Sequence, residues 1–298
     1  MAEWHEPVMV EEVLEYLPHQ PDGVYVDGTT GTGGHASRIL ARLGAGGRLL
    51  CADQSEDALD AARSRLSEWG SRVVYFRGSF SNLDRALSEL AIERVDGILL
   101  DLGLNSWLLA RGDCGLSYQI DVPLTMRLDP DLIETAESFL AHATHEELTS
   151  VLRDFGDLPR APLFARRIVE ARQRARISTT GALVRALAGE RGPALTPNEL
   201  SRIFGALRTR VNREMERLEE FLDRCPEWLA PGGRLVVISY ASHEDRRVKR
   251  AYGAKGRDAR LEPLLKSPRV PAVDEVRRNP RSRSAKLRAF VRGANDNV

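Results

Sequence analysis

An α/β protein is predicted, with a doubly wound parallel sheet into which an all-helical segment is inserted. Residues 1–101 alternate continuous apolar runs with segments of helical spacing, as do parallel strands that are buried on both faces. From 133 to 187 the periodicity is helical throughout, and an apolar run of the first kind returns only at 234–239. These observations favour one sheet that is built from two separate parts of the chain.

The first part of the sheet is predicted from four apolar runs and the helical spacing between them. The strands are expected at 23–27, 48–53, 72–76 and 95–101, and the helices at 37–43, 58–66 and 83–90. Such helices have the length needed to connect neighbouring parallel strands.

Beyond this part the alternation stops. Residues 103–127 are loop-like, with three glycines and a proline, and helical patterns follow. The apolar spacing after Pro197 predicts one long helix over 200–225. A fifth strand at 234–239 follows a Pro-Gly-Gly turn, and alternating residues at 287–292 predict a terminal strand.

The chain is therefore expected to consist of a sheet domain with an insertion. We assign residues 1–107 to the first part of the core and 108–206 to a helical insertion for substrate recognition. Residues 207–298 form the second part of the core with a basic C-terminal segment.

The composition is that of an ordinary soluble protein, with 42% hydrophobic and 29% charged residues. No apolar run approaches the roughly 18 residues of a membrane span, and the acidic start of the chain lacks a signal-peptide pattern. Cys51, Cys114 and Cys225 are too widely spaced for a C-x-x-C site, and His142 and His145 lack a third ligand. We expect a cytoplasmic protein without a membrane or a metal.

A net charge of zero conceals a gradient along the chain. Between Arg246 and Arg292 there are 16 Lys and Arg residues against four Asp and Glu residues, a local charge of +12. A second cluster, from Arg160 to Arg176, holds six arginines and one glutamate. Basic segments of this kind suit a polyanion with phosphates to neutralise, although a solvated, salt-bridged surface has the same composition.

A glycine-rich segment, Asp27-Gly-Thr-Thr-Gly31-Thr-Gly33-Gly34-His35, follows the first predicted strand and opens a helix. Glycines let a ligand approach the backbone, and the start of the helix offers free N–H groups. Asp53 closes the second strand, where a carboxylate can accept hydrogen bonds from both hydroxyls of a ribose. The pattern predicts an adenosine-bearing cofactor; a tight glycine turn with a capping Asp53 is the structural alternative.

Two cofactors fit this loop. The spacing of Gly31, Gly33 and Ala36, with Asp53 further on, satisfies a dinucleotide fingerprint, so an NAD-dependent oxidoreductase stays open. S-adenosylmethionine is favoured because Phe80 follows the third strand and Asp101 closes the fourth. Its adenine, ribose and amino acid need separate partners, whereas Asp27 would repel a pyrophosphate.

Beyond the glycine segment, the chain holds the motifs His5-Glu-Pro-Val, Asp96-Gly-Ile-Leu-Leu-Asp-Leu-Gly103, Pro123-Leu-Thr-Met-Arg-Leu-Asp-Pro130, Pro231-Gly-Gly-Arg-Leu235 and Asn279-Pro-Arg-Ser-Arg-Ser-Ala-Lys-Leu-Arg288. Through these motifs, of which the last is the most specific, nearly the whole chain resembles the bacterial 16S ribosomal RNA cytosine-N4 methyltransferases. The resemblance implies a Rossmann-like class I methyltransferase sheet with an inserted all-helical domain. It also implies S-adenosylmethionine as cofactor, with contacts at Gly33, Gly34, His35, Asp53, Phe80 and Asp101.

Departures from the family pattern lie mostly on the substrate side. Where the family has Val-Ser-Ser-Pro-Gln, this chain has Leu104-Asn-Ser-Trp-Leu108, so a polar cofactor contact becomes Leu108. The family motif Phe-His-Ser-Leu-Glu-Asp reads Tyr240-Ala-Ser-His-Glu-Asp245. Two alternatives follow, namely a divergent methyltransferase with another acceptor and a catalytically inactive RNA- or ribosome-binding relative.

The chemistry of methyl transfer assigns roles to the residues after the fourth strand. The reaction is an in-line displacement, so the enzyme mainly holds the acceptor about 3 Å from the methyl group. A cytosine amine is a poor nucleophile, and a carboxylate that accepts one of its N–H groups would orient it. Asp101, with Asn105 and Ser106 after it, is the catalytic candidate; a contact to the cofactor ammonium alone is the alternative for Asp101. Trp107 or Tyr118 would either stack on an unstacked base or simply pack in the protein.

The leading hypothesis is an S-adenosylmethionine-dependent RNA N-methyltransferase that N4-methylates a cytosine of 16S ribosomal RNA. Its partner is ribosomal RNA or the small ribosomal subunit, and the protein is a monomer or a homodimer. Arg281, Arg283 and Lys286 are the predicted RNA contacts. In the competing interpretation this C-terminal motif folds back into the sheet, and its arginines pair with internal carboxylates.

Overall fold

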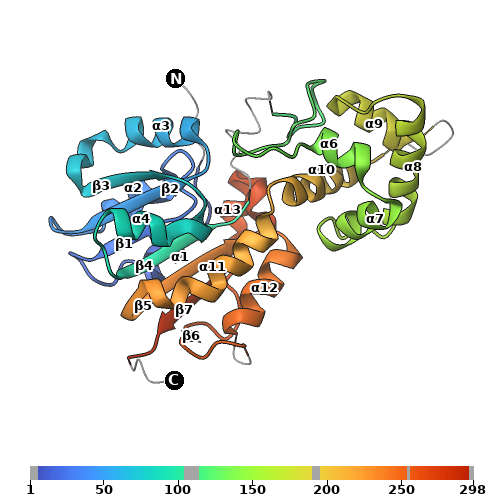
Figure 1. Ribbon diagram of the computed structural model, residues 1–298. Helices are drawn as coiled ribbons and strands as arrows, with labels where there is room; N and C mark the ends of the chain where they lie inside the picture. Colours follow the sequence, from blue (N-terminus) through green and yellow to red (C-terminus); the bar gives the residue numbers. More distant parts are fainter. Residues whose placement is uncertain (1–5, 104–113, 190–194, 254–255, 295–298) are drawn as a thin grey trace. The chain divides into compact units, whose positions relative to one another are not determined.

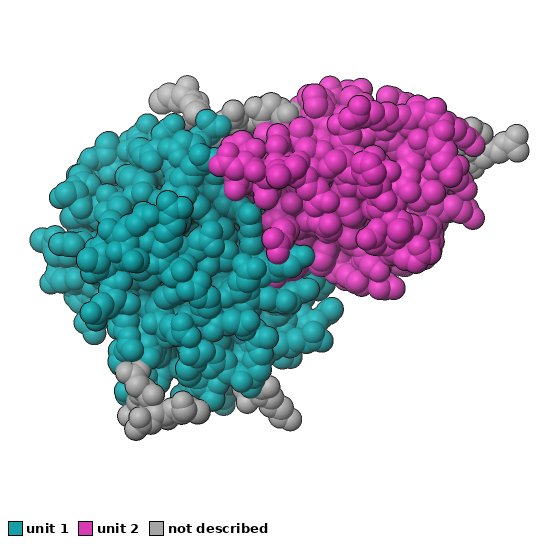
Figure 2. All heavy atoms as spheres, viewed as in Figure 1, with its two compact units in different colours: residues 1–107, 216–298 teal, residues 108–215 magenta. Residues whose placement is uncertain are grey.

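The computed structural model describes residues 6–103, 114–189, 195–253 and 256–294. The chain divides into two compact units, residues 1–107 with 216–298 and residues 108–215 (Figure 2). The expected boundary at 206/207 falls inside helix α10 (Pro197–Val211). This helix continues without a break past residue 206, so it is not divided between the units, and the second unit ends at residue 215.

The first unit is built on a seven-stranded sheet with the order β3-β2-β1-β4-β5-β7-β6 (Figure 1). Its parallel strands are β1 (Val24–Asp27), β2 (Arg48–Asp53), β3 (Val73–Arg77), β4 (Val95–Asp101) and β5 (Leu229–Ser239). β7 (Lys286–Arg292) is antiparallel to β5 and to the short β6 (Leu261–Pro263). The predicted α/β fold class is confirmed, and β6 is an additional strand.

Helices cover both faces of this sheet. On one face, residues such as Tyr25 and Leu99 are buried in a cluster with side chains of α1 (Val10–Tyr16), α2 (Gly34–Leu40) and α3 (Glu56–Arg65). On the other face lie α4 (Leu83–Glu89), α11 (Glu214–Trp228) and α12 (Ser242–Tyr252) (Figure 1). Tyr252 of α12 contacts Phe290 of β7 edge to face, with ring centroids 5.4 Å apart. Burial on both faces explains why the strands read as continuous apolar runs.

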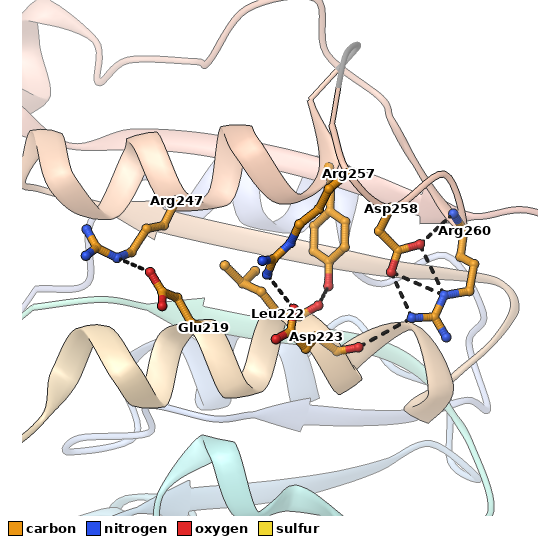
Figure 3. A network of polar contacts seen from close by, with 8 residues as sticks. Glu219, Leu222, Asp223, Arg247, Arg257, Asp258 and Arg260 are labelled. Atoms are coloured by element: carbon orange, nitrogen blue, oxygen red, sulfur yellow. Dashed lines mark hydrogen bonds and ion pairs between the residues drawn. The ribbon is translucent and has the colours of Figure 1, made fainter.

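A network of polar contacts connects α11 with α12 and with the segment that follows α12 (Figure 3). Arg247 Nε of α12 lies 2.7 Å from Glu219 Oε1 of α11, and Arg257 forms an ion pair with Asp223 of α11. Arg260 pairs with Asp258 at 2.8 Å. These arginines belong to the basic segment from 246 to 292, so part of its charge is balanced within the first unit.

The second unit is helical. Besides α10 it contains α6 (Ala136–His142), α7 (His145–Asp154), α8 (Ala161–Arg174) and α9 (Thr180–Ala188). α6, α7 and α10 each begin with a capping box, in which a threonine accepts a hydrogen bond from the backbone three residues on. Such caps satisfy N–H groups that have no partner inside the helix.

The single long helix predicted over 200–225 is wrong. α10 ends at Val211 and α11 begins at Glu214, and Arg213 between them has a φ of 51°. The buried Asn212 amide donates to the Met126 carbonyl at 2.8 Å and its oxygen accepts from the Leu128 N–H at 2.8 Å. These long-range bonds fix the break, which the uninterrupted apolar spacing does not reveal.

The basic cluster from Arg160 to Arg176 is largely paired within the second unit. Arg167 donates to the Leu187 carbonyl at 2.6 Å, and Arg172 donates to the Leu140 and Ala143 carbonyls at the end of α6. Further partners are carboxylates, Glu199 for Arg160, Glu170 for Arg166 and Glu137 for Arg176. This cluster fits the salt-bridged alternative better than a surface reserved for a polyanion.

Among the described residues, no helix is both long enough and apolar enough to cross a membrane.

Candidate active site

The carboxyl ends of neighbouring strands bring three predicted acidic residues to one edge of the sheet. Asp27 ends β1, Asp53 ends β2 and Asp101 ends β4. β1 lies between β2 and β4 in the sheet, and all three strands are parallel. The edge is therefore where open α/β sheets bind their ligands.

The glycine loop is fastened to both strands beside β1. The Gly31 N–H donates to Asp53 Oδ2 at 2.8 Å, and Thr29 Oγ1 accepts the Asp101 N–H at 2.6 Å. Gly33 has a φ of 78°, a left-handed conformation that a residue with a Cβ adopts only under strain. These two hydrogen bonds fix the conformation of the loop, and Gly33 occupies the position whose backbone conformation requires a glycine.

Asp53 does not cap the helix that follows it. Its Oδ1 accepts the Ser55 N–H at 2.9 Å, and Ser55 is itself the N-cap of α3. Burial raises the pKa of Asp53 above its usual value, against the effect of the backbone donors Ser55 and Gly31. The capping alternative considered from the sequence is therefore wrong, and Asp53 links β2 to the glycine loop.

Asp27 is a buried carboxylate with an unused oxygen. It is 1% exposed, its Oδ1 accepts the Thr29 N–H at 3.2 Å, and its Oδ2 has no hydrogen-bond partner among the described residues. Burial raises its pKa to about 7, although His35 opposes the shift. A buried acceptor of this kind is costly unless a ligand or a proton satisfies it.

Asp101 lies between two side chains from other elements. His35 Nε2 of α2 is 3.5 Å from Asp101 Oδ2, and the Tyr240 hydroxyl donates to Asp101 Oδ1 at 2.9 Å. Neither ring nitrogen of the buried His35 forms a hydrogen bond with the part of the chain that the structure describes. Tyr240 was missed as a site residue by sequence reasoning. The available signal was its position directly after β5, at the edge where β4 also ends.

Of the remaining predicted site residues, the structure describes the surroundings of some, whereas others lie outside the described ranges. Gly34 begins α2, and a Cβ added there would lie 3.2 Å from Pro7. Phe80 is nearly buried, and its ring packs edge to face on Phe221 of α11 at 5.6 Å. Tyr118 packs similarly on Phe204, which fits the packing alternative. The predicted residues Asn105, Ser106, Trp107 and Leu108 lie outside the described residues.

No group of three metal-ligating side chains occurs in the described ranges. His142 and His145 each have a ring nitrogen within hydrogen-bond distance of a carbonyl oxygen, that of Ser138 and that of Pro162.

The C-terminal motif is divided between surface and interior. Arg281 and Arg283 are exposed on a short 3-10 helix (Pro280–Ser284), whereas Ser282 between them is buried. Arg288 of β7 forms two hydrogen bonds with the Asp245 carboxylate, at 2.6 and 3.2 Å, and Lys286 lies 3.7 Å from the same carboxylate. The motif therefore does enter the sheet with its last residues, from Lys286 to Arg288 of β7, and Arg288 forms the close pair with Asp245.

The fold and the site together define a class. A Rossmann-like sheet that includes an antiparallel β7, with an acidic residue at the end of each strand around the glycine loop, is that of a class I methyltransferase. The model of the MraW methylase family matches residues 2–292, and the chain belongs to this family. The resemblance stated from the sequence and the predicted methyltransferase class are thereby confirmed.

Similar proteins share nearly the whole chain. "Ribosomal RNA small subunit methyltransferase H" of Methylobacillus flagellatus is 42% identical over 97% of this chain and 95% of its own length. The protein of the same name from Sorangium cellulosum is 42% identical over 98% of this chain and 91% of its own. The one from Nitratidesulfovibrio vulgaris is 39% identical over 98% and 86%.

Proposed function

We propose that the protein uses S-adenosylmethionine to methylate the N4 amine of a cytosine in 16S ribosomal RNA. The observation that carries the proposal is the full-length similarity to relatives that are named ribosomal RNA small subunit methyltransferases. The arrangement of three acids and a glycine loop at one sheet edge supports it independently. A divergent acceptor and an inactive RNA-binding relative have no comparable observation in their favour.

The residues at the edge fit this cofactor. The unused Asp27 oxygen favours a ligand with positive charge, which suits a sulfonium or an ammonium and disfavours a pyrophosphate. Asp53 accepts the Gly31 N–H on Oδ2 and the Ser55 N–H on Oδ1. A carboxylate has about four acceptor sites, so lone pairs remain for ribose hydroxyls. When bound, S-adenosylmethionine supplies a methyl group on a cationic sulfur. Gly33, Gly34, His35 and Phe80 are the further residues that we propose to line its site.

Asp101 is the proposed acceptor of an N–H from the cytosine amine, with Asn105 and Ser106 beside it in sequence. A contact to the cofactor ammonium is the alternative role for Asp101. The helical insertion is proposed to recognise the RNA, and Arg281, Arg283 and Lys286 to contact phosphates. The proposed setting is the cytoplasm, where ribosomal RNA is assembled with its proteins.

Replacing Asp53 with alanine should weaken S-adenosylmethionine binding about tenfold to a hundredfold, because a charged hydrogen-bond acceptor is lost. The variant should also melt at a lower temperature, since the Gly31 and Ser55 N–H groups lose their acceptor. Calorimetric titration and a thermal melt measure the two effects. Asp57→Ala, an equal loss of charge on the exposed start of α3, is the control and should bind normally. Unchanged affinity in Asp53→Ala would contradict the cofactor site.

Transfer of a tritiated methyl group tests the proposed function. Small ribosomal subunits and naked 16S RNA from a strain that lacks the modification are the two substrates. We expect label in N4-methylcytosine after digestion to nucleosides, and we expect the protein to bind S-adenosylmethionine but not NAD. Label in a different nucleoside would overturn the acceptor, and cofactor binding without any transfer to RNA would favour the inactive relative.

A further inference from the structure

Tyr240 lies where the last residues of β4 and β5 meet. β4 and β5 are neighbours in the sheet, and Asp101 pairs in register with Ile238, two residues before Tyr240. The Tyr240 hydroxyl donates to Asp101 Oδ1 at 2.9 Å, while His35 Nε2 lies 3.5 Å from Oδ2. Each oxygen of the Asp101 carboxylate therefore faces a different neighbour.

The rest of Tyr240 is held independently of its hydroxyl. Its backbone N–H donates to Glu244 Oε2 at 2.8 Å, and this buried carboxylate also accepts the Ala241 N–H at 2.9 Å. On its other side the ring lies against the backbone of Gly103, where an added Cβ would be 3.0 Å from the ring. Gly103 has a φ of 126°, so the turn after Asp101 is shaped around this aromatic ring.

We propose that Tyr240 is a positioning residue for methyl transfer, whose hydroxyl fixes the orientation of the Asp101 carboxylate. The inference rests on the proposed function, in which Asp101 accepts an N–H from the methyl acceptor. A carboxylate held through Oδ1 keeps Oδ2 in a fixed place beside His35, which saves the entropy of ordering the carboxylate during the reaction.

The groups around Tyr240 and Asp101 keep the Tyr240 hydroxyl in its neutral, hydrogen-bond-donating form. Asp27 from β1 and His35 from α2 interact electrostatically with Asp101, and Glu244 from α12 and Glu275 from α13 (Val273–Arg278) act on Tyr240. Burial and the Asp101 carboxylate raise the pKa of Tyr240 well above its ordinary value, so Tyr240 stays a donor.

Tyr240→Phe tests the proposal because it removes the hydroxyl and keeps the ring that packs against Gly103. Carboxyl carbon-13 NMR of aspartate-labelled protein at one pH, with Asp101 assigned by Asp101→Asn, should show a changed chemical shift for the Asp101 carboxyl carbon, because Oδ1 loses its donor. In the methyl-transfer assay kcat should fall about tenfold to a hundredfold, with an unchanged KM for RNA. An unchanged Asp101 carboxyl chemical shift, or an unchanged kcat, would overturn the proposal.

Tyr252→Phe is the matched control. Tyr252 is a buried tyrosine at the end of α12 in the same unit. Its hydroxyl donates to the Leu222 carbonyl and not to Asp101. Tyr252→Phe should lower the melting temperature without changing the Asp101 carboxyl chemical shift or kcat. If Tyr240→Phe merely reproduces this behaviour, its role is structural and the inference is wrong. Wild-type protein without any methyl transfer would refute the proposed function, whereas active wild type beside a fully active Tyr240→Phe refutes this inference alone.

Discussion

Asp27→Asn should stabilise the cofactor-free protein and at the same time remove most of its affinity for S-adenosylmethionine. Burial raises the pKa of Asp27 to about 7, because its carboxylate is 1% exposed and one oxygen has no partner among the described residues. At pH 8 the folded protein therefore holds a charge that the unfolded chain would solvate. Three pKa units correspond to up to about 4 kcal/mol, of which asparagine should recover a part.

The pH dependence of this effect has a defined sign. The pKa of Asp27 is raised in the folded state, so the stability that it contributes is present below its unfolded value of 3.8 and is lost as the pH rises toward 7. The gain in melting temperature of Asp27→Asn over wild type should accordingly grow between about pH 4 and 7 and stay constant above. Thermal melts of both proteins across this range measure it.

The affinity of the wild-type protein for the cofactor should rise with pH over the range in which its stability falls. A cationic ligand beside Asp27 needs the ionised carboxylate, so wild-type affinity should rise about tenfold per pH unit below 7 and level off above it. The affinity of Asp27→Asn should be weak and nearly independent of pH. Asp57→Asn, an equal change of charge on the exposed start of α3, should bind the cofactor as the wild type does. Equal affinity of Asp27→Asn and wild type at pH 8 would exclude Asp27 from the cofactor site.

The sheet could be predicted because its strands are buried on both faces. β1 to β5 and β7 therefore appear in the sequence as apolar or alternating runs near their observed positions. β6 has only three residues and ends in a proline, so it has no such signal. The break between α10 and α11 was missed for a different reason. Val211 and Met215 keep the apolar spacing across it, while the bonds that fix it join Asn212 to residues more than 80 positions away.

The acids of the site could be predicted for a similar reason. Asp27, Asp53 and Asp101 each end an apolar run, and parallel order alone brings such ends to one edge. The hydrogen bond from Tyr240 to Asp101 depends on β5 lying beside β4, and strand order is not written in the spacing of either run. Pairing of arginines is equally hidden, because it depends on which carboxylates the folded chain brings near.

Arg281 and Arg283 should contribute to RNA binding without contributing to the fold. Both are exposed on the 3-10 helix before β7, and neither forms an ion pair within the described part of the chain. Ser282 and Ala285 are buried, so this short segment packs through its small residues and directs its arginines outward. Replacing both arginines with alanine should lower the slope of log affinity against log salt by about 0.7–0.9 for each lost phosphate contact.

Arg288 of the same motif should behave in the opposite way. Its guanidinium and the Asp245 carboxylate are 13% and 14% exposed, and removing Arg288 leaves this largely buried anion with Lys286 at 3.7 Å as its remaining partner. Loss of one member of such a pair costs on the order of 3 kcal/mol, which a thermal melt detects easily. The RNA salt slope of Arg288→Ala should equal that of wild type at a temperature where the variant is folded.

Comparing the two variants separates the surface of the motif from its interior. We expect Arg281→Ala with Arg283→Ala to keep the wild-type melting temperature and cofactor affinity, and to differ only in RNA affinity and its salt slope. A lower melting temperature with an unchanged slope would assign these arginines to the fold, as Arg288 is. Because all three lie within eight residues of one motif, differences in local sequence composition cannot account for opposite results. Only the direction of each side chain, outward at 281 and 283 and toward Asp245 at 288, distinguishes them.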